Sequence, residues 1–333
     1  MLFLERYGPQ RRHRLCLLLL GGAAGKSAQL GLHAWLPSAI EAPTPISALI
    51  HAATLVTAGV YLLSRVVPEG SGPFLAAGAV TLLIAGLVGV SQTDLKRTVA
   101  FSTCSQVGYM VLSRGNGSSS AALLLLVTHA FYKALLFISA GVVIHSSRDL
   151  QDIRLLGARG FSLPVSKELF ACASLSLCAF PSSAGDFSKD LILEELGYSS
   201  LTLHHGFWLC GLCGTFLTGA YSGRLLRIVF AADSRVIAPT SQHEPVSSVL
   251  ILLLVLGVAS TASGLLIAEA VAIAPSNPCE AGYALIVEQS PSVYTSLLPL
   301  SLALLGGAFG IYLPFPPSRL TFALHSISFN QAL

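Results

Sequence analysis

Apolar runs of membrane-spanning length follow one another along almost all of this 333-residue chain. A helix needs about 20 apolar residues to cross the hydrocarbon core of a bilayer, and short connections rich in glycine, proline and serine separate the runs. Backbone at that depth must satisfy its hydrogen bonds internally, so we expect an all-α polytopic membrane protein with about nine transmembrane helices and no division into separate domains. The runs are 15–36, 46–67, 74–91, 95–113, 121–146, 164–196, 203–231, 246–268 and 293–313.

The composition excludes several other classes of protein. Only 11% of the residues are charged, against about 25% in a soluble domain, which excludes a soluble enzyme. The net charge of +3 is small and no basic stripe is interleaved with aromatic residues, so we expect the lipid bilayer and no nucleic acid as a partner. No phosphate-binding glycine loop or haem motif is present, and we expect no cofactor or metal in this chain. Cys210 and Cys213 form a lone C-x-x-C inside an apolar run, where small packing residues are the expected interpretation.

Ionisable residues inside the apolar runs are the main functional signal. A charge at the centre of a membrane helix costs roughly 3 kcal/mol or more, so such residues usually have a function. Lys26 follows Gly25 about a third to halfway along the first run, and His51 lies in the second run beyond a proline-rich elbow at residues 41–45. Three of the five lysines lie in apolar runs, whereas arginine supplies the charges between them. Buried lysine can lose its proton and arginine does not, which indicates proton or cation transfer.

Two further sites follow downstream. His129 and Lys133 are four residues apart, so they lie on one helix face, with the hydroxyls of Thr128 and Tyr132 beside them. Two titratable groups one turn apart in the middle of a membrane helix have no obvious structural role.

Lys189 and Asp190 follow a break that we expect at Pro181 and Gly185. Adjacent residues point about 100° apart on a helix, so this lysine and this aspartate need not bond to each other. Asp186 adds a further acid to the same segment. The first run also looks broken, because Gly21, Gly22 and Gly25 flank Lys26. Broken helices with ion sites at the break are typical of transporters.

Simpler interpretations remain for each of these residues. Lys26 is alternatively a lysine that snorkels from near a helix end, and its partner is not obvious because the carboxylate closest in sequence, Glu41, lies in the elbow. His51 is alternatively a hydrogen-bonded core residue. The segment of Lys189 and Asp190 alternatively ends at the surface, as we expect for Glu194 and Glu195. Residues 151–154 read as a solvated basic loop.

Loop charges predict how the chain is threaded. With nine helices, one side receives most of the basic loop residues and is the expected cytoplasmic or matrix side. Arg65 and Arg114 fall on the other side. The N-terminal arginines also fall there, which contradicts the rule that basic residues gather on the cytoplasmic or matrix side. The basic residues on the expected cytoplasmic or matrix side are Lys96, Arg97, Arg148, Arg154, Arg159, Arg224, Arg227 and Arg235. The N-terminal arginines are Arg6, Arg11, Arg12 and Arg14.

Five motifs identify a family resemblance over roughly residues 20–200. They are GKSAQLGLHAWLPSAIEAPTPISALIHAATLVTAGVYLL, DLKRTVAFSTCSQVGYMVL, THAFYKALLFISAG, QDIRLLG and GDFSKD. Together they closely resemble the antiporter-like pumping subunits of respiratory complex I (NADH–ubiquinone oxidoreductase), chain 5 in particular. Beyond Leu203 the resemblance is mainly in hydropathy, with His243–Pro245 as an additional mark.

The resemblance implies inverted five-helix repeats, several of whose helices are discontinuous. Residues 15–67 would be the last two helices of a first repeat, 73–231 a complete second repeat and 246–313 two C-terminal helices, with tails at 1–14 and 314–333. Lys26 would be the lysine of the first half-channel and His51 the relay between the halves. His129 with Lys133 would form the central exchange, and Lys189 with Asp190 the exit.

The implied function is proton translocation coupled to remote quinone reduction, in a mitochondrial inner membrane or, alternatively, a bacterial plasma membrane. FMN, iron–sulfur clusters and ubiquinone would belong to other subunits of the complex. Members of the family usually carry about six more helices before the first one here, with a glutamate that pairs with the equivalent of Lys26. We therefore expect the C-terminal part of a split or truncated subunit, with that glutamate on a separate chain.

Two other departures from the family pattern stand out. A second histidine is common one turn before His129, where this chain has Leu125, so we expect the relay to run through water there. The residues after Leu313 are too few for the long lateral helix and the last helix that usually follow, so we expect these to be on another piece or lost. The alternatives are a subunit of a related cation/proton antiporter or membrane-bound hydrogenase, or an inert structural piece.

Overall fold

The structure is a bundle of helices. It is a computed structural model that describes residues 9–66, 72–157, 163–198, 202–231, 244–273 and 293–312. The described elements are α2 (Pro9–Lys26), α3 (Trp35–Ser38), a 3₁₀ turn η1 (Ala39–Glu41), α4 (Thr44–Ala52), α5 (Leu55–Val66), α6 (Gly72–Ser91), α7 (Leu95–Asn116), α8 (Ser119–Ser146), α9 (Pro164–Leu177), α10 (Ala184–Gly197), α11 (Thr202–Leu226), a π-helical turn η2 (Arg227–Ala231), α12 (Ser247–Ile273) and α14 (Val293–Tyr312). The expected all-α fold is confirmed.

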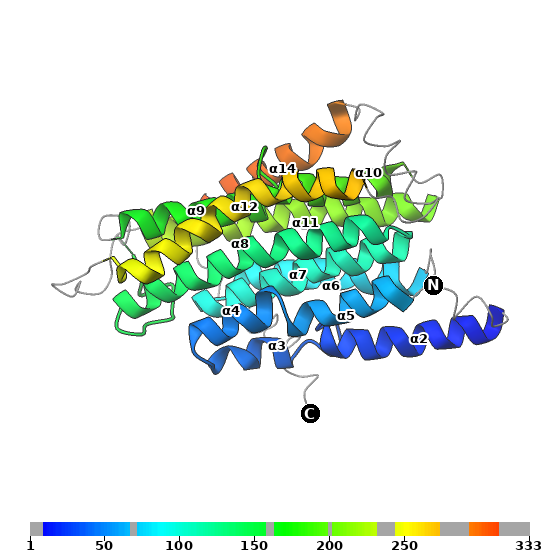
Figure 1. Cartoon of the computed structure of the whole chain (residues 1–333), viewed down its shortest axis with the longest axis horizontal. Coiled ribbons are helices and arrows are strands. Elements are labelled where there is room, and N and C mark those ends of the chain that lie inside the picture. Colours follow the sequence, from blue (N-terminus) through cyan, green and yellow to red (C-terminus); the bar gives the residue numbers. More distant parts are fainter. Residues whose placement is uncertain are drawn as a thin grey trace.

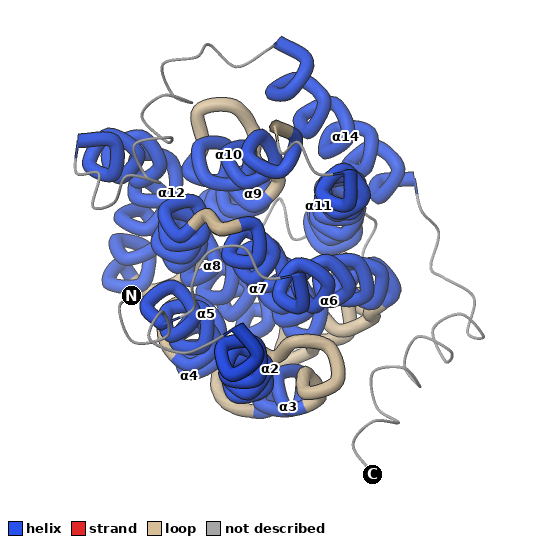
Figure 2. The backbone as a smooth tube through the Cα atoms, turned by 90° about the vertical axis from the view of Figure 1, so that its right-hand side faces the viewer, coloured by secondary structure: helices blue, strands red, loops and turns tan. Residues whose placement is uncertain are grey.

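The long helices run roughly parallel to one another along the long axis of the molecule (Figure 1). Seen end-on, α7 and α8 lie in the middle and the other helices surround them (Figure 2). Almost every side chain of α7 is buried. Within the described residues, four helical stretches are long and apolar enough to cross a membrane: 44–66, 72–91, 119–146 and 247–267. The chain is therefore a multi-pass membrane protein whose central helix is α7.

The first apolar run is broken beside Lys26, as its glycines predicted, but the position of the lysine differs from the expected one. Helix α2 begins at Pro9, earlier than predicted, and ends at Lys26, so this lysine lies at a helix end instead of inside a transmembrane helix. The backbone then turns through Ala28 and Gly31, both with positive φ. Tertiary contacts fix this turn: the Ser27 hydroxyl donates to the carbonyl of Val56 over 2.8 Å. The Trp35 indole donates to the carbonyl of Gly25 over 2.8 Å.

Two more of the predicted transmembrane helices are interrupted. The break between α9 and α10 falls where the proline and glycine predicted it, and it holds Ala179 and Ser182 in the left-handed region, with φ of 59° and 65°. A Cβ on Gly185 would lie 1.8 Å from the carbonyl oxygen of Ser176, so only glycine fits there. The break between α4 and α5 was not predicted, because no glycine or proline marks it. It begins immediately after Ala52, one residue beyond His51.

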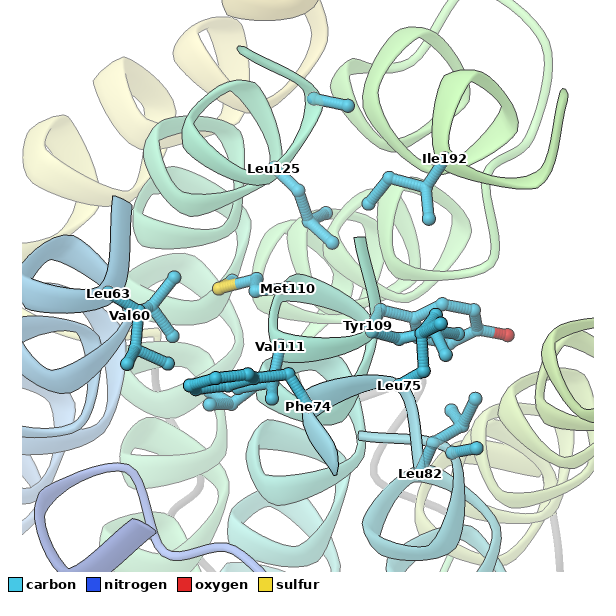
Figure 3. Packing of buried hydrophobic residues seen from close by; sticks show 14 of the residues in the cluster. Val60, Leu63, Phe74, Leu75, Leu82, Tyr109, Met110, Val111, Leu125 and Ile192 are labelled. Carbon is cyan, nitrogen blue, oxygen red and sulfur yellow. The ribbon is translucent and has the colours of Figure 1, made fainter. Parts of the chain in front are cut away.

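Helices α6 and α7 pack backbone against backbone through Gly78, Gly108 and Gly115. Beside this contact lies a cluster of buried apolar side chains from α5, α6, α7, α8 and α10. Leu125 of α8 is fully buried in it and points toward Ile192 of α10 (Figure 3). Cys210 packs against the same cluster.

The loops at one end of the bundle are tied together. Residues 93–95 and 151–153 form a short antiparallel bridge, in which Leu95 N donates to the Gln151 carbonyl over 2.9 Å and Ile153 N donates to the Thr93 carbonyl over 2.8 Å. Ile153 is fully buried. The prediction of a solvated loop at residues 151–154 therefore holds for Gln151 and Arg154, which are exposed, but not for Ile153.

Arginine is not confined to exposed loops. Arg224 is buried and donates to the carbonyls of Val90 and of Gln92, the latter over 3.0 Å. Arg114 is buried at the other end of the bundle and donates to the Leu63 carbonyl over 3.3 Å. Both cover the ends of helices, where backbone carbonyls lack intrahelical donors. The predictions for Arg6, Arg159, Arg235, His243 and the tail beyond Leu313 lie outside the described residues.

Candidate functional site

Three of the predicted residues meet between α4 and α8. His51, His129 and Lys133 are each 0% exposed. The imidazole of His51 stacks on Phe137, with ring centroids 5.2 Å apart and planes inclined by 19°. His51 lies one residue before the end of α4, and α8 supplies the other two side chains from adjacent turns. The structure thus places two imidazoles and one amine in a single buried cluster beside a helix break.

The imidazole of His129 faces that break. The carbonyl of Ala52, the last residue of α4, lies within its reach. The terminal carbonyls of a helix have no intrahelical donor, so they are available to a side chain. The ring nitrogens of His51 and His129 make no well-formed hydrogen bond to another described residue. His129 also contacts Tyr132 edge-on, with the centroids 5.4 Å apart.

Lys133 is held by hydroxyl and carbonyl oxygens of α7. Its ammonium nitrogen donates to the Ser102 hydroxyl and, over 3.3 Å, to the Val99 carbonyl. Among the described residues no carboxylate lies within ion-pair distance of it. Both histidines are close enough to sense its charge. A proton on one of these three groups therefore disfavours a proton on the others.

Lys189 of α10 has similar surroundings. It is 1% exposed and donates to the Thr218 hydroxyl of α11 over 3.3 Å. Its ammonium also lies 5.0 Å from the centre of the Tyr109 ring, a cation–π contact. Cys178, just after α9 ends, senses the charges of both Lys133 and Lys189. The two lysines therefore border one buried region beside the α9–α10 break.

Asp190 forms no ion pair with Lys189, in line with the expectation that the pair need not bond, although each of the two side chains senses the charge of the other. It is half-buried, within hydrogen-bonding reach of Asp186 one turn earlier. Farther along α10 the prediction for Glu195 was wrong, because its carboxylate accepts a hydrogen bond from Ser118 over 2.9 Å and its other oxygen is shielded from solvent. Glu195 faces the loop after α7 and lies apart from the lysines.

Lys26 lies apart from the buried lysines and histidines, unlike the other predicted basic residues. It is exposed at the end of α2, a position that suits the snorkelling alternative as well as contact with a partner. Exposed leucines surround its helix end, among them Leu18 at 73% and Leu32 at 51%. Its surface is thus apolar with one charge at the edge.

Sequence reasoning missed four residues that lie between the two lysines: Ser102, Gln106, Thr218 and Tyr221. All four are buried. The signal was present, since residues 102–106 read STCSQ and residues 218–222 read TGAYS in the middle of apolar runs. Serine and threonine are common in membrane helices, however, where their hydroxyls usually bond to their own backbone.

Comparisons with known proteins agree with this architecture. Residues 7–218 match the family described as NADH:quinone oxidoreductase/Mrp antiporter, TM. Over 316 residues the chain is 41% identical to NADH-ubiquinone oxidoreductase chain 5 of Metridium senile, covering 92% of this chain and 50% of that one. It is 49% identical over 224 residues to the Arabidopsis thaliana chain 5, covering 65% and 33%. It is 40% identical over 314 residues to NADH-quinone oxidoreductase subunit L of Rickettsia conorii, covering 90% and 47%.

A solved structure shares the fold. The Mrp complex from Dietzia superposes with a TM-score of 0.72 at 24% identity, over 97% of this chain and 38% of that one. The present chain spans half or less of the length of these relatives.

Proposed function

The chain belongs to the NADH:quinone oxidoreductase/Mrp antiporter membrane family, and from that premise we propose that it is a proton-translocating membrane-arm subunit of a complex I-type NADH:quinone oxidoreductase. It moves protons through buried lysines and histidines while quinone is reduced elsewhere in the complex. The identity of 40–49% to chain 5 and subunit L relatives favours this complex over an antiporter. The membrane is the mitochondrial inner membrane or a bacterial plasma membrane.

One observation carries the proposal: His51, His129 and Lys133 converge, fully buried, beside the break between α4 and α5. Uncompensated ionisable groups at this depth are costly, and a purely structural element gains nothing from three of them. Interrupted helices expose backbone carbonyls that bind protonated groups or water. Two breaks, one on each side of α8, give a proton both an approach and a departure.

The roles follow from position. His51 exchanges protons with the His129–Lys133 pair, which acts as the central station. Mutual repulsion within the pair means that loading one group promotes release from the other. Lys189 forms the next station and Asp190, with Asp186, the half-buried exit. Lys26 loads the half-channel that precedes His51.

Lys26 needs a carboxylate from outside the described residues. It is exposed on an apolar surface, where a lone ammonium in lipid would be costly. We propose that a mid-membrane glutamate approaches it, on a separate chain of the membrane arm or on another part of the same protein. FMN, iron–sulfur clusters and ubiquinone reside on other subunits. Mass spectrometry of the purified assembly checks for a helical partner with such a glutamate and for NADH-oxidising subunits, which an antiporter would lack.

Lys133→Ala tests the function directly. In the assembled complex reconstituted into vesicles, we expect NADH-driven proton pumping per assembled complex to fall several-fold. Ser139→Ala is the matched control, because it removes a buried hydroxyl of the same helix that bonds only to the carbonyls of Leu135 and Leu136. Normal assembly and normal pumping by Lys133→Ala would show an inert structural piece and refute the proposal.

A further inference from the structure

The side chains that hold the two buried lysines converge on one tyrosine. Tyr221 of α11 is 1% exposed. Its hydroxyl lies within reach of Thr218, Gln106 and Ser102. Ser102 accepts from Lys133 and Thr218 accepts from Lys189. A single phenol therefore stands between the two lysine acceptors.

The hydrogen bonds of this tyrosine are not made in the structure. Its hydroxyl has no well-formed hydrogen bond among the described residues, and neither side-chain polar atom of Gln106 has one either. A buried polar group without a partner costs about 1–3 kcal/mol, so native structures rarely leave one without a reason. Two such groups lie side by side between two titratable lysines, where they can accept and donate hydrogen bonds along a path from one lysine to the other.

The neighbouring Ser102 and Thr218 hydroxyls can redirect their protons by rotation. The Ser102 hydroxyl now donates to the Val99 carbonyl over 2.7 Å and the Thr218 hydroxyl to the Gly214 carbonyl over 2.7 Å, each within its own helix. Rotating either hydroxyl about its bond to Cβ redirects the proton without moving the oxygen, so that the Thr218 hydroxyl can donate to Tyr221 while it accepts from Lys189, and the Ser102 hydroxyl can donate to the neutral amine of Lys133. Serine, threonine and tyrosine hydroxyls both donate and accept, as a proton relay requires.

We propose that Tyr221 is the relay residue between Lys133 and Lys189, an inference that rests on the proposed proton-translocating function. A proton leaves the Lys189 ammonium for the Thr218 oxygen, and Thr218 passes its own hydroxyl proton to Tyr221. Tyr221 passes its own to Ser102, and Ser102 passes its own to the neutral amine of Lys133. Each hydroxyl ends with one proton, so the net change is one proton moved between the lysines. The same steps run in reverse, and Gln106 orients the phenol.

A second polar contact, between α8 and α10, is less suited to carry a proton between the two lysines. Thr128 and Ser188 contact each other over 3.0 Å between α8 and α10, but, unlike Ser102 and Thr218, neither accepts from a lysine. One turn away, the apolar Leu125 and Ile192 face each other (Figure 3). The position where we expected a water relay, at Leu125, is therefore occupied by an apolar contact. The polar side chains between the two lysines belong to α7 and α11.

Tyr221→Phe removes only the hydroxyl and is measured in the assembled complex reconstituted into vesicles. We expect proton pumping per assembled complex to fall several-fold and to slow more in D₂O than the parent does, because proton transfer becomes limiting. A packing defect would not change the isotope effect. Tyr61→Phe is the matched control, since that tyrosine is 49% exposed on α5 and accepts only from Arg65.

The two proposals fail separately. Parent-like pumping and isotope effect in Tyr221→Phe, with Lys133→Ala defective, would overturn the relay and leave the proposed function intact. Parent-like pumping in Lys133→Ala would overturn both. If Tyr221→Phe does not assemble, Gln106→Leu is measured instead: a lowered pumping rate with a raised isotope effect supports the relay, and parent-like values overturn it.

Discussion

The close contact between α6 and α7 gives the sharpest prediction about the fold. A Cβ on Gly78 would lie 2.5 Å from the backbone nitrogen of Leu112 and 2.8 Å from the carbonyl oxygen of Gly108. These atoms belong to the backbone of α7 and cannot rotate away. Carbon atoms normally approach no closer than about 3.5 Å, so Gly78→Ala forces the helices apart by roughly 1 Å.

The expected loss follows from this displacement. Overpacking of a well-packed interior costs about 1–3 kcal/mol, and alanine returns about 0.5–1 kcal/mol because it favours a helix more than glycine does. We expect a net fall in the free energy of unfolding of about 1–2 kcal/mol. The shift also moves α7 relative to its neighbours, and α7 holds Lys133 through Ser102. Pumping should therefore fall as well.

Titration of the purified chain from mild detergent into SDS, followed by far-ultraviolet circular dichroism, measures the free energy of unfolding. Gly206→Ala is the matched control, because Gly206 is exposed on α11 and a Cβ there meets nothing within 4 Å. That control should gain up to about 1 kcal/mol. If Gly78→Ala unfolds at the same detergent fraction as the parent or above it, the inferred backbone contact is wrong.

Two further predictions concern the loops. The Glu244 carboxylate accepts from Val165 N over 2.8 Å and from the Ser166 hydroxyl over 2.7 Å at the start of α9. Glu244→Gln removes the negative charge that favours this helix end, so hydrogen exchange at the first turn of α9 should become faster. Unchanged exchange would count against the contact. The bond from Arg154 lowers the pKa of Asp152, so this stabilisation of the loop is present at neutral pH and is lost as the pH falls through the lowered value, below about 3.9. Proteolysis at residues 151–157 by an acid-active protease should rise at low pH in the parent and much less in Asp152→Asn, and equal pH dependence in both would contradict the assignment.

Hydropathy and short-range spacing were sufficient for most of the fold. The apolar runs predicted the helices because lipid leaves the backbone no alternative. Gly185 and its neighbouring proline predicted the break before α10, since both residues act locally. The pairing of His129 and Lys133 needed only the helical period. In each case the outcome depends on residues a few positions apart.

Tertiary contacts decided what could not be predicted. No helix-breaking residue marks the end of α4, where Thr54 donates to the Leu49 carbonyl over 2.9 Å and Ser27, from a distant segment, bonds to Val56. The same long-range bond ends α2 near Lys26, which is why this lysine lies at a helix end. The polar residues of α7 and α11 could not be matched to each other because sequence does not specify which faces meet.

Lys133 is held by a hydroxyl and a carbonyl oxygen and Lys189 by a hydroxyl, and among the described residues neither lysine forms an ion pair with a carboxylate. A carboxylate beside Lys133 or Lys189 would favour the ammonium form strongly, and the lysine would release its proton only with a large penalty. A hydroxyl accepts from the ammonium and, after rotation, donates to the neutral amine, so both charge states keep a partner. A lysine with such partners can change its protonation without unfolding its surroundings. Hydroxyl partners in place of an ion-paired carboxylate are thus what permits a buried amine to carry protons, and introducing an acid at Ser102 would trap Lys133 in its charged form.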